Sequence, residues 1–147
     1  MNFYKAVQNR RTNYTISAAS PISDERLESI VREMVQFTPS SFHSQSSRVI
    51  LLLNDRHHKL WNIVMQTLKA IVPAEAFAAT EAKINSFDAG YGTILYFEDQ
   101  AVVQGCQEAF PLYKDNFPVW SNQSSGMLQC NIWTALTLEG FGVSLQH

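Results

Sequence analysis

The sequence predicts an α+β fold in which helices flank a small central sheet. Apolar residues recur with helical spacing over residues 27–35 and 60–72. Two short apolar runs, 49–53 and 93–97, have the length of strands, and a further extended segment begins at residue 143. Three such strands make a sheet too small to close by itself. We therefore expect segments from outside this chain to complete it.

The composition indicates one folded domain and argues against several classes of protein. The sequence has 147 residues, of which 46% are apolar, and a formal net charge of −2. These values fit a single domain spanning residues 1–147, without disorder and without the basic surface that binds nucleic acid. No apolar run reaches the ~20 residues of a membrane-spanning helix, and the amino terminus lacks the apolar core of a signal peptide. We expect a cytoplasmic protein without nucleic-acid or membrane partners.

The cysteines and histidines lack the spacing of a metal site. Cys106 and Cys130 are far apart and have no His at metal-ligand intervals, so we expect free, buried thiols. His57 and His58 are adjacent, and adjacent side chains point about 100° apart on a helix. We therefore expect both histidines at the surface and no bound metal.

The first part of the chain predicts two helices. A short helix ends at the polar residues 9–13 and carries Phe3, Ala6 and Val7 on one face. The second helix begins after Ser23, whose hydroxyl can cap it, and two acids in its first turn suit the positive end of the helix dipole. Its apolar side chains predict a face that packs on the core: Leu27, Ile30, Val31, Met34 and Val35.

The middle of the chain predicts a strand followed by two helices. The run 49–53 has no polar alternation, which is typical of a strand covered on both faces. A helix beginning near residue 56 ends at Pro73, and an Ala-rich helix follows up to Lys83.

Two patterns near the second strand indicate structure rather than chemistry. Gly-Tyr-Gly at 90–92 precedes the strand 93–97 and lacks the third glycine of a phosphate loop, so it predicts a tight turn. Glu98 and Asp99 precede a predicted helix at 100–110. Their charges suit the amino-terminal end of that helix, and we interpret them as capping residues rather than catalytic carboxylates.

The most apolar segment is a predicted helix from Ser121 to Glu139. It follows an expected loop at 117–121 and ends at Gly140. Its apolar residues cover most of its circumference, so it must be buried on several sides, either in the core or against a second subunit. The sequence then stops within the extended segment 143–145 without a polar terminator. We expect the natural product to continue beyond this point.

A polar connection at 38–45, Thr-Pro-Ser-Ser-Phe-His-Ser-Gln, separates the second helix from the first strand. Pro39 stops the helix, and the eight residues offer four hydroxyls, a carboxamide and an imidazole. This segment is either an ordinary surface loop or a binding loop held between two rigid elements.

A second polar cluster follows the first helix directly. Arg10 and Arg11 present planar donors that suit a phosphate group, and Thr12 adds a hydroxyl. The cluster is either a site for a phosphorylated ligand or a solvated basic pair.

Taken together, five segments resemble the nitroreductase family of FMN-dependent oxidoreductases. The first segment follows the first helix, the second precedes the first strand and the third follows the long helix. In that order they are Arg10-Arg11-Thr12-Asn13-Tyr14, Pro39-Ser40-Ser41-Phe42-His43-Ser44-Gln45 and Glu139-Gly140-Phe141-Gly142-Val143-Ser144-Leu145-Gln146-His147. Two more resemble the branch of fungal proteins linked to fatty-acid signalling and oxidative stress: Gly90-Tyr91-Gly92-Thr93-Ile94-Leu95-Tyr96-Phe97-Glu98-Asp99 and Phe117-Pro118-Val119-Trp120-Ser121-Asn122-Gln123-Ser124-Ser125-Gly126-Met127. The resemblance covers essentially the whole chain.

The resemblance implies a three-layer α/β/α sandwich with a central mixed, mainly antiparallel sheet, here incomplete at the carboxyl terminus. It also implies a homodimer with FMN at the subunit interface. On this basis Arg10, Arg11, Thr12 and Tyr14 would hold the phosphate and ribityl chain. A loop from the other subunit would cover the isoalloxazine ring with Pro39, Ser40, Ser41, Phe42, His43 and Gln45. The backbone at Leu145, Gln146 and His147 would face the reactive flavin edge, and Lys83 would approach the pyrimidine end.

The implied activity is electron transfer from NADH or NADPH to a nitroaromatic, quinone or related small-molecule acceptor. The flavin would carry the redox chemistry, so no side chain is expected to be an essential acid or base. His43 stands where the family usually has Asn, and it is a candidate proton source. The alternative is a flavin-binding regulatory or interaction protein, or a truncated form, with little turnover.

Overall fold

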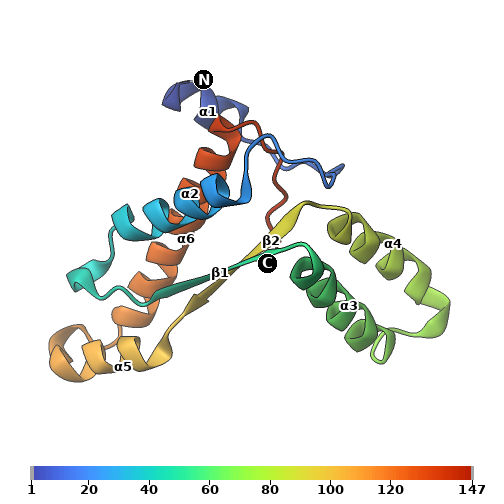
Figure 1. Ribbon diagram of the computed structural model, residues 1–147. Helices are drawn as coiled ribbons and strands as arrows, with labels where there is room; N and C mark the ends of the chain where they lie inside the picture. Colours follow the sequence, from blue (N-terminus) through green and yellow to red (C-terminus); the bar gives the residue numbers. More distant parts are fainter. Residues whose placement is uncertain (1, 147) are drawn as a thin grey trace.

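The computed structural model describes residues 2–146, and its organising element is the long helix α6. Helices α1, α2 and α5 pack against α6, and both strands also contact it (Figure 1). Among residues 2–146 there is no helix long and apolar enough to cross a membrane. The elements, with η for a 3₁₀ helix, are α1 (Phe3–Asn9), α2 (Asp24–Phe37), η1 (Ser41–His43), β1 (Ser47–Leu53), α3 (Asp55–Lys69), η2 (Ala74–Ala76), α4 (Phe77–Asp88), β2 (Gly92–Glu98), α5 (Gln100–Ala109), η3 (Pro111–Tyr113) and α6 (Phe117–Leu138).

The strands β1 and β2 form an antiparallel pair whose register runs from Ser47 opposite Glu98 to Leu53 opposite Gly92. The expectation that β1 is covered on both faces is wrong for this chain, because Ile50 is 46% exposed while its neighbours face the core. The expected third strand is also not part of this sheet. Val143 instead forms an isolated parallel bridge with Thr12, because its carbonyl accepts the backbone N–H of Asn13 at 3.0 Å.

The core lies between α2, α6 and the inner face of the sheet. Leu27 and Val31 of α2 meet three apolar residues of α6, and alternate β1 residues cover them from the side. Burying one such side chain contributes about 1.5–3 kcal/mol, so this cluster dominates the packing. The buried apolar residues of the cluster are Leu27, Val31, Leu128, Ile132 and Leu136.

Local sequence signals set most helix ends as predicted. The Ser23 hydroxyl accepts the Arg26 N–H at 3.3 Å, and the Asp99 carboxylate accepts the Ala101 N–H at 3.0 Å. Gly140 follows α6 with a φ of +95°, the left-handed conformation that glycine adopts without steric cost. In α1, only Ala6 of the predicted apolar face is buried.

Helix α6 begins earlier than the sequence indicated. The predicted loop at 117–121 is wrong because α6 starts at Phe117 with Pro118 in its first turn, where the missing N–H costs nothing. Four hydroxyl groups on α6 are buried, and each donates a hydrogen bond to a backbone carbonyl three or four residues earlier, so none is left unpaired in the core. They belong to Ser121, Ser124, Thr134 and Thr137. The expectation of buried thiols is also wrong, since Cys130 is exposed on α6 and Cys106 is half-buried.

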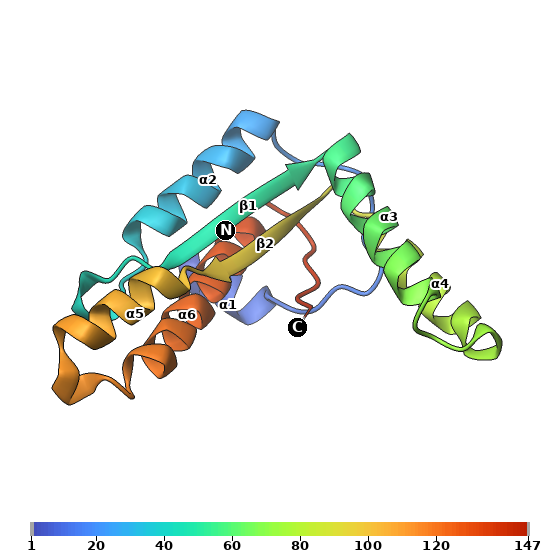
Figure 2. The same ribbon diagram turned by 90° about the horizontal axis from the view of Figure 1, so that it is seen from below.

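Helices α3 and α4 form a hairpin that projects from one end of the sheet (Figures 1 and 2). The expectation that His57 lies at the surface is wrong, because its side chain is only 1% exposed at the base of this hairpin. Its ring joins three elements: Nδ1 lies 2.8 Å from Thr93 Oγ1 of β2, and Nε2 lies 3.0 Å from the Asp88 carbonyl of α4. His58 is exposed, as expected.

Replacing Ile132 with alanine tests the packing of α6. Ile132 is fully buried, so Ile132→Ala leaves a cavity and is expected to lower the free energy of unfolding by about 2–5 kcal/mol in urea denaturation. Ile71→Ala is the control, because Ile71 is 71% exposed and its loss should change stability by less than about 0.5 kcal/mol. Equal effects of the two substitutions would contradict this account of the core.

Candidate functional site

The loop between α2 and β1 has an unusual backbone. Phe42, His43 and Gln45 have φ values of +55°, +53° and +53°, in the left-handed region that non-glycine residues rarely adopt. Each such residue costs about 1–3 kcal/mol, and strain of this kind is concentrated at functional sites. The loop closes on itself because the Ser40 hydroxyl accepts the Gln45 N–H at 2.9 Å. This backbone distinguishes the loop from an ordinary surface connection.

The side chain of Phe42 anchors the loop to the start of α6. Its ring stacks on Trp120 with centroids 5.8 Å apart and planes 19° apart, and it contacts Phe117 at 5.3 Å. Phe110 and Tyr113 complete what we call the aromatic cluster (Phe42, Phe110, Tyr113, Phe117 and Trp120). Phe42 remains 50% exposed. The cluster therefore presents an aromatic surface beside the strained loop.

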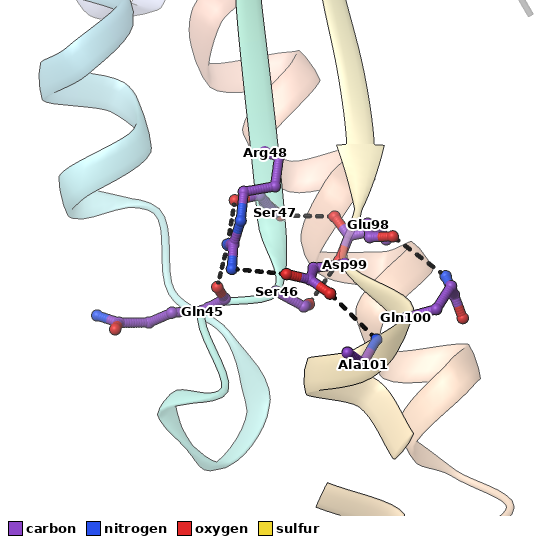
Figure 3. A network of polar contacts seen from close by, with 8 residues as sticks. All are labelled: Gln45, Ser46, Ser47, Arg48, Glu98, Asp99, Gln100 and Ala101. Carbon is purple, nitrogen blue, oxygen red and sulfur yellow. Dashed lines mark hydrogen bonds and ion pairs between the residues drawn. The ribbon is translucent and has the colours of Figure 1, made fainter. Parts of the chain in front are cut away.

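A polar network fixes the other end of the loop to the sheet (Figure 3). The Ser46 and Ser47 hydroxyls donate to the two carboxylate oxygens of Glu98 at 2.5 and 2.6 Å. Arg48 donates to the Gln45 carbonyl at 2.8 Å and pairs with Asp99 at 3.0 Å. Glu98 is therefore not the helix cap that its position suggested. It accepts from the residues that lead from the loop into β1, and Asp99 alone caps α5.

His43 and Gln45 contact each other at the exposed edge of the loop. Gln45 Nε2 lies 3.0 Å from His43 Nε2. A carboxamide and an imidazole can each donate and accept a hydrogen bond, so this contact holds the His43 ring against Gln45. His43 is exposed and follows Phe42 of the aromatic cluster directly in the sequence.

The second predicted group of residues lies at the opposite end of α6. The Arg10 guanidinium lies 4.4 Å from the ring centroid of Trp133, and Arg11 donates to the Arg10 carbonyl at 3.3 Å. Within residues 2–146 neither guanidinium pairs with a carboxylate. Thr12 is held by its bridge to Val143, and Tyr14 is 84% exposed. Arg11 and Thr12 are thus exposed on this segment, and Arg10 is half-buried against Trp133.

One chain does not bring these two groups of residues together. Phe42 contacts Trp120 while Arg10 contacts Trp133, and these tryptophans are 13 positions apart on α6. At 1.5 Å per residue their separation along the helix is about 20 Å. Figure 1 shows the loop and the 10–14 segment at opposite ends of α6.

A cavity of about 930 Å³ lies between the sheet, α3, α6 and residues 140–146. Leu145 and Gln146 line it, whereas His147 lies outside the described residues. Burial raises the pKa of the Tyr96 phenol, so this group stays protonated. Trp133 Nε1 is buried and has no hydrogen-bond partner within residues 2–146. The largest side chains lining the cavity are aromatic: Trp61, Phe87, Tyr91, Tyr96, Trp133 and Phe141.

Lys83 does not lie with either group of predicted residues. It is an exposed residue of α4, and its Nζ is 5.9 Å from the ring centroid of Phe87. Phe87 lines the same cavity as Leu145 and Gln146. The approach of Lys83 to the pyrimidine end of a flavin stays a prediction.

Several aromatic residues of the site were not singled out by the sequence patterns. Phe110 and Tyr113 flank Pro111, and Trp120 follows Pro118 by two positions. Aromatic residues around prolines at helix boundaries are an available signal, but only the fold shows that they converge on Phe42.

Removing the Glu98 carboxylate tests whether the network of Figure 3 holds the loop. Glu98→Ala leaves the Ser46 hydroxyl, which is 1% exposed, without its acceptor and is expected to cost about 1–3 kcal/mol of stability. Backbone amide exchange at 44–47 should accelerate. Glu108→Ala removes an exposed carboxylate from α5 and is the control. Unchanged exchange at 44–47 in Glu98→Ala would contradict an anchoring role.

Comparison with known proteins agrees with this architecture. The sequence profile of the Nitroreductase family matches residues 7–147. HBN1 and the nitroreductase FRM2 of Saccharomyces cerevisiae are each 31% identical to this chain over 99% of its length, and the matches cover 73% and 74% of those proteins. The nitroreductase CinD from Lactococcus lactis in complex with nicotinic acid is 46% identical, with a TM-score of 0.89 over 99% of this chain and 74% of that chain. Other structures of CinD contain chloramphenicol and 4-nitrophenol. The predicted α+β, nitroreductase-like fold is thereby confirmed, and this chain belongs to the nitroreductase family.

Proposed function

We propose that this chain is a single FMN-binding domain of a cytoplasmic homodimer. The enzyme takes electrons from NADH or NADPH and passes them to a nitroaromatic, quinone or related acceptor. The proposal rests on one observation. The predicted flavin-binding residues form two groups, and the groups contact α6 at positions about 20 Å apart along the helix. A second copy of the chain can place the loop of one subunit beside the arginines of the other.

The residues near α1 fit the phosphate of FMN. Arg10 and Arg11 have no carboxylate partner within the described part of the chain, so their donors are available to an anion. Arginine binds phosphate through charge-assisted, often bidentate hydrogen bonds. The Thr12 hydroxyl lies on the same exposed segment. We assign these three residues to the phosphate and ribityl chain, with Tyr14 beside them.

The aromatic cluster fits a flat ring. Phe42 is half exposed and is held by its stacking on Trp120, so it offers a preorganised surface that costs little entropy on binding. CinD binds nicotinic acid, chloramphenicol and 4-nitrophenol, each of which contains an aromatic ring. We infer that the loop 39–45 covers the flavin of the other subunit and that the aromatic surface receives the acceptor.

In this proposal FMN, when bound, supplies hydride acceptance and electron donation, and the chain supplies position and protons. Phe42 and the rest of the aromatic cluster exclude water from one side of the ring. We assign exposed His43, at the edge of the loop, as a proton source for the reduced acceptor. The backbone at Leu145 and Gln146 lines the neighbouring cavity and is assigned to the flavin edge.

The surface of α6 supports the homodimer. Val119 is 53% exposed, Met127 is 42% exposed and Cys130 is also exposed. These residues share one side of the helix, at spacings of eight and three positions. We call them the α6 stripe. Both groups of site residues contact α6, and exposed apolar surface of this kind marks protein–protein interfaces. We therefore infer that a second copy packs against the α6 stripe.

Flavin reduction tests the proposed activity. The purified protein incubated with FMN should retain yellow colour after gel filtration, bleach anaerobically with NADH or NADPH and recover with 4-nitrophenol. Arg11→Ala should weaken FMN binding about 10- to 150-fold, which corresponds to the 1.5–3 kcal/mol of a charged hydrogen bond. Arg32→Ala is the control because, within residues 2–146, the Arg32 guanidinium pairs with Glu28 on α2 and with no other carboxylate.

The outcomes separate the alternatives. Protein that stays colourless after reconstitution contradicts the flavin assignment. Protein that binds FMN but is not bleached by either nicotinamide contradicts the oxidoreductase and favours a flavin-binding regulatory protein. Equal FMN affinity of Arg11→Ala and Arg32→Ala contradicts the placement of the phosphate.

A charge in the α6 stripe tests the dimer. Met127→Glu should convert the dimer to a monomer in light scattering, because a carboxylate would be buried without a partner at the interface. Ile63→Glu is the matched control, since Ile63 is also an exposed apolar helix residue, 54% exposed, but lies on α3. A Met127→Glu dimer as stable as that of Ile63→Glu would exclude the stripe as the interface.

A further inference from the structure

The base of the α3–α4 hairpin brings together three side chains of the kind that bind transition metals. His57 and His58 lie in the first turn of α3, and Asp88 is the last residue of α4. One ligand atom from each residue lies within 4.8 Å of the other two. Asp88 lies 30 positions after His58 in the sequence, so the spacing of the histidines and cysteines along the chain does not reveal this cluster.

The distances fit a divalent metal. Zn²⁺ binds His nitrogen and Asp oxygen at about 2.0–2.2 Å in tetrahedral geometry, which places neighbouring ligand atoms about 3.3–3.5 Å apart. Asp88 Oδ1 lies 2.8 Å from His58 Nδ1 and 3.9 Å from His57 Nε2. These two separations bracket the required value. Rotation of the exposed His58 and the half-buried Asp88 would bring these two separations to the required value.

The surroundings of His57 can orient its ring for a metal. Trp61 Nε1 donates to Thr93 Oγ1 at 3.0 Å, and the same oxygen lies 2.8 Å from His57 Nδ1. The Asp88 carbonyl, 3.0 Å from His57 Nε2, can only accept a hydrogen bond, so without a metal Nε2 donates to it and Nδ1 accepts from the Thr93 hydroxyl. A metal on Nε2 would replace this hydrogen bond, with the ring proton moved to Nδ1, where Thr93 Oγ1 can accept it. An outer oxygen that receives the other ring N–H is typical of metal-binding histidines. The carbonyl end of α4 beside this nitrogen also favours a cation.

We propose that His57 Nε2, His58 Nδ1 and Asp88 Oδ1 form a binding site for a divalent transition-metal ion such as Zn²⁺, with water as the fourth ligand. The site joins α3 to the end of α4, and through Thr93 it joins both helices to β2. A bound ion would therefore fix the orientation of the projecting α3–α4 hairpin relative to the sheet (Figure 2). This assignment is independent of the proposed flavin chemistry.

Calorimetric titration with ZnCl₂ in a non-coordinating buffer tests the site. The wild-type protein is expected to bind one ion per chain, and Co²⁺ should give the visible absorption of a tetrahedral site. His58→Ala and Asp88→Asn each remove one ligand from a side chain that is more than a third exposed, so the fold should survive. Each should weaken Zn²⁺ binding at least 10-fold. Loss of an outer-shell partner alone weakens metal affinity by about 10- to 100-fold, so loss of a direct ligand should weaken it at least as much.

Asp55→Asn is the matched control. Asp55 lies in the same turn of α3 but offers no ligand atom to the site, so this substitution should leave the affinity unchanged. Zn²⁺ should also raise the melting temperature of the wild type and of Asp55→Asn, and not that of the two ligand variants, because only a folded site binds. The proposal is overturned if the wild type takes up no Zn²⁺, or if all four proteins bind it equally.

Discussion

The need to cover α6 determines the arrangement of this chain. The helix is apolar around most of its circumference, and Leu128 and Ile132 on its inner side are almost completely buried. Helix α2 and the inner face of the β1–β2 pair supply this cover, while α1 and α5 pack on the helix along its length. The cover is unequal, because Val119 and Met127 remain exposed. The same hydrophobic requirement that builds the core thus leaves one side of α6 available to a second chain.

The length of α6 determines how the candidate site is divided. The helix spans 22 residues, so features at its two ends are held apart by a rigid element. At one end, the aromatic cluster and the Glu98 network hold a loop with three left-handed residues. At the other end, Arg10 rests on Trp133, and Asn13 bonds to Val143. Because α6 is rigid, one chain keeps these two ends apart, and for this reason we propose that a second copy completes the site.

The residue types of the candidate site could be read from the sequence, because the chemistry of two guanidiniums and of a hydroxyl-rich loop is a property of the side chains themselves. The positions of these groups could not. The convergence of Phe110, Tyr113 and Trp120 on Phe42 depends on how α5, η3 and α6 meet. Likewise, Glu98 was predicted as a cap from its position before a helix. Strand pairing instead places it opposite Ser47, where it accepts two hydroxyls.

The sequence by itself determined the fold class, the helix caps at Ser23 and Asp99, and the turn after α6, because these depend on local periodicity and on single side chains near the backbone. Tertiary structure alone decided three other features. His57 is buried because α4 and β2 close over it, Val143 pairs with Thr12 rather than with the sheet, and α6 extends back to Phe117. Each depends on contacts between distant segments, which periodicity along the chain does not encode.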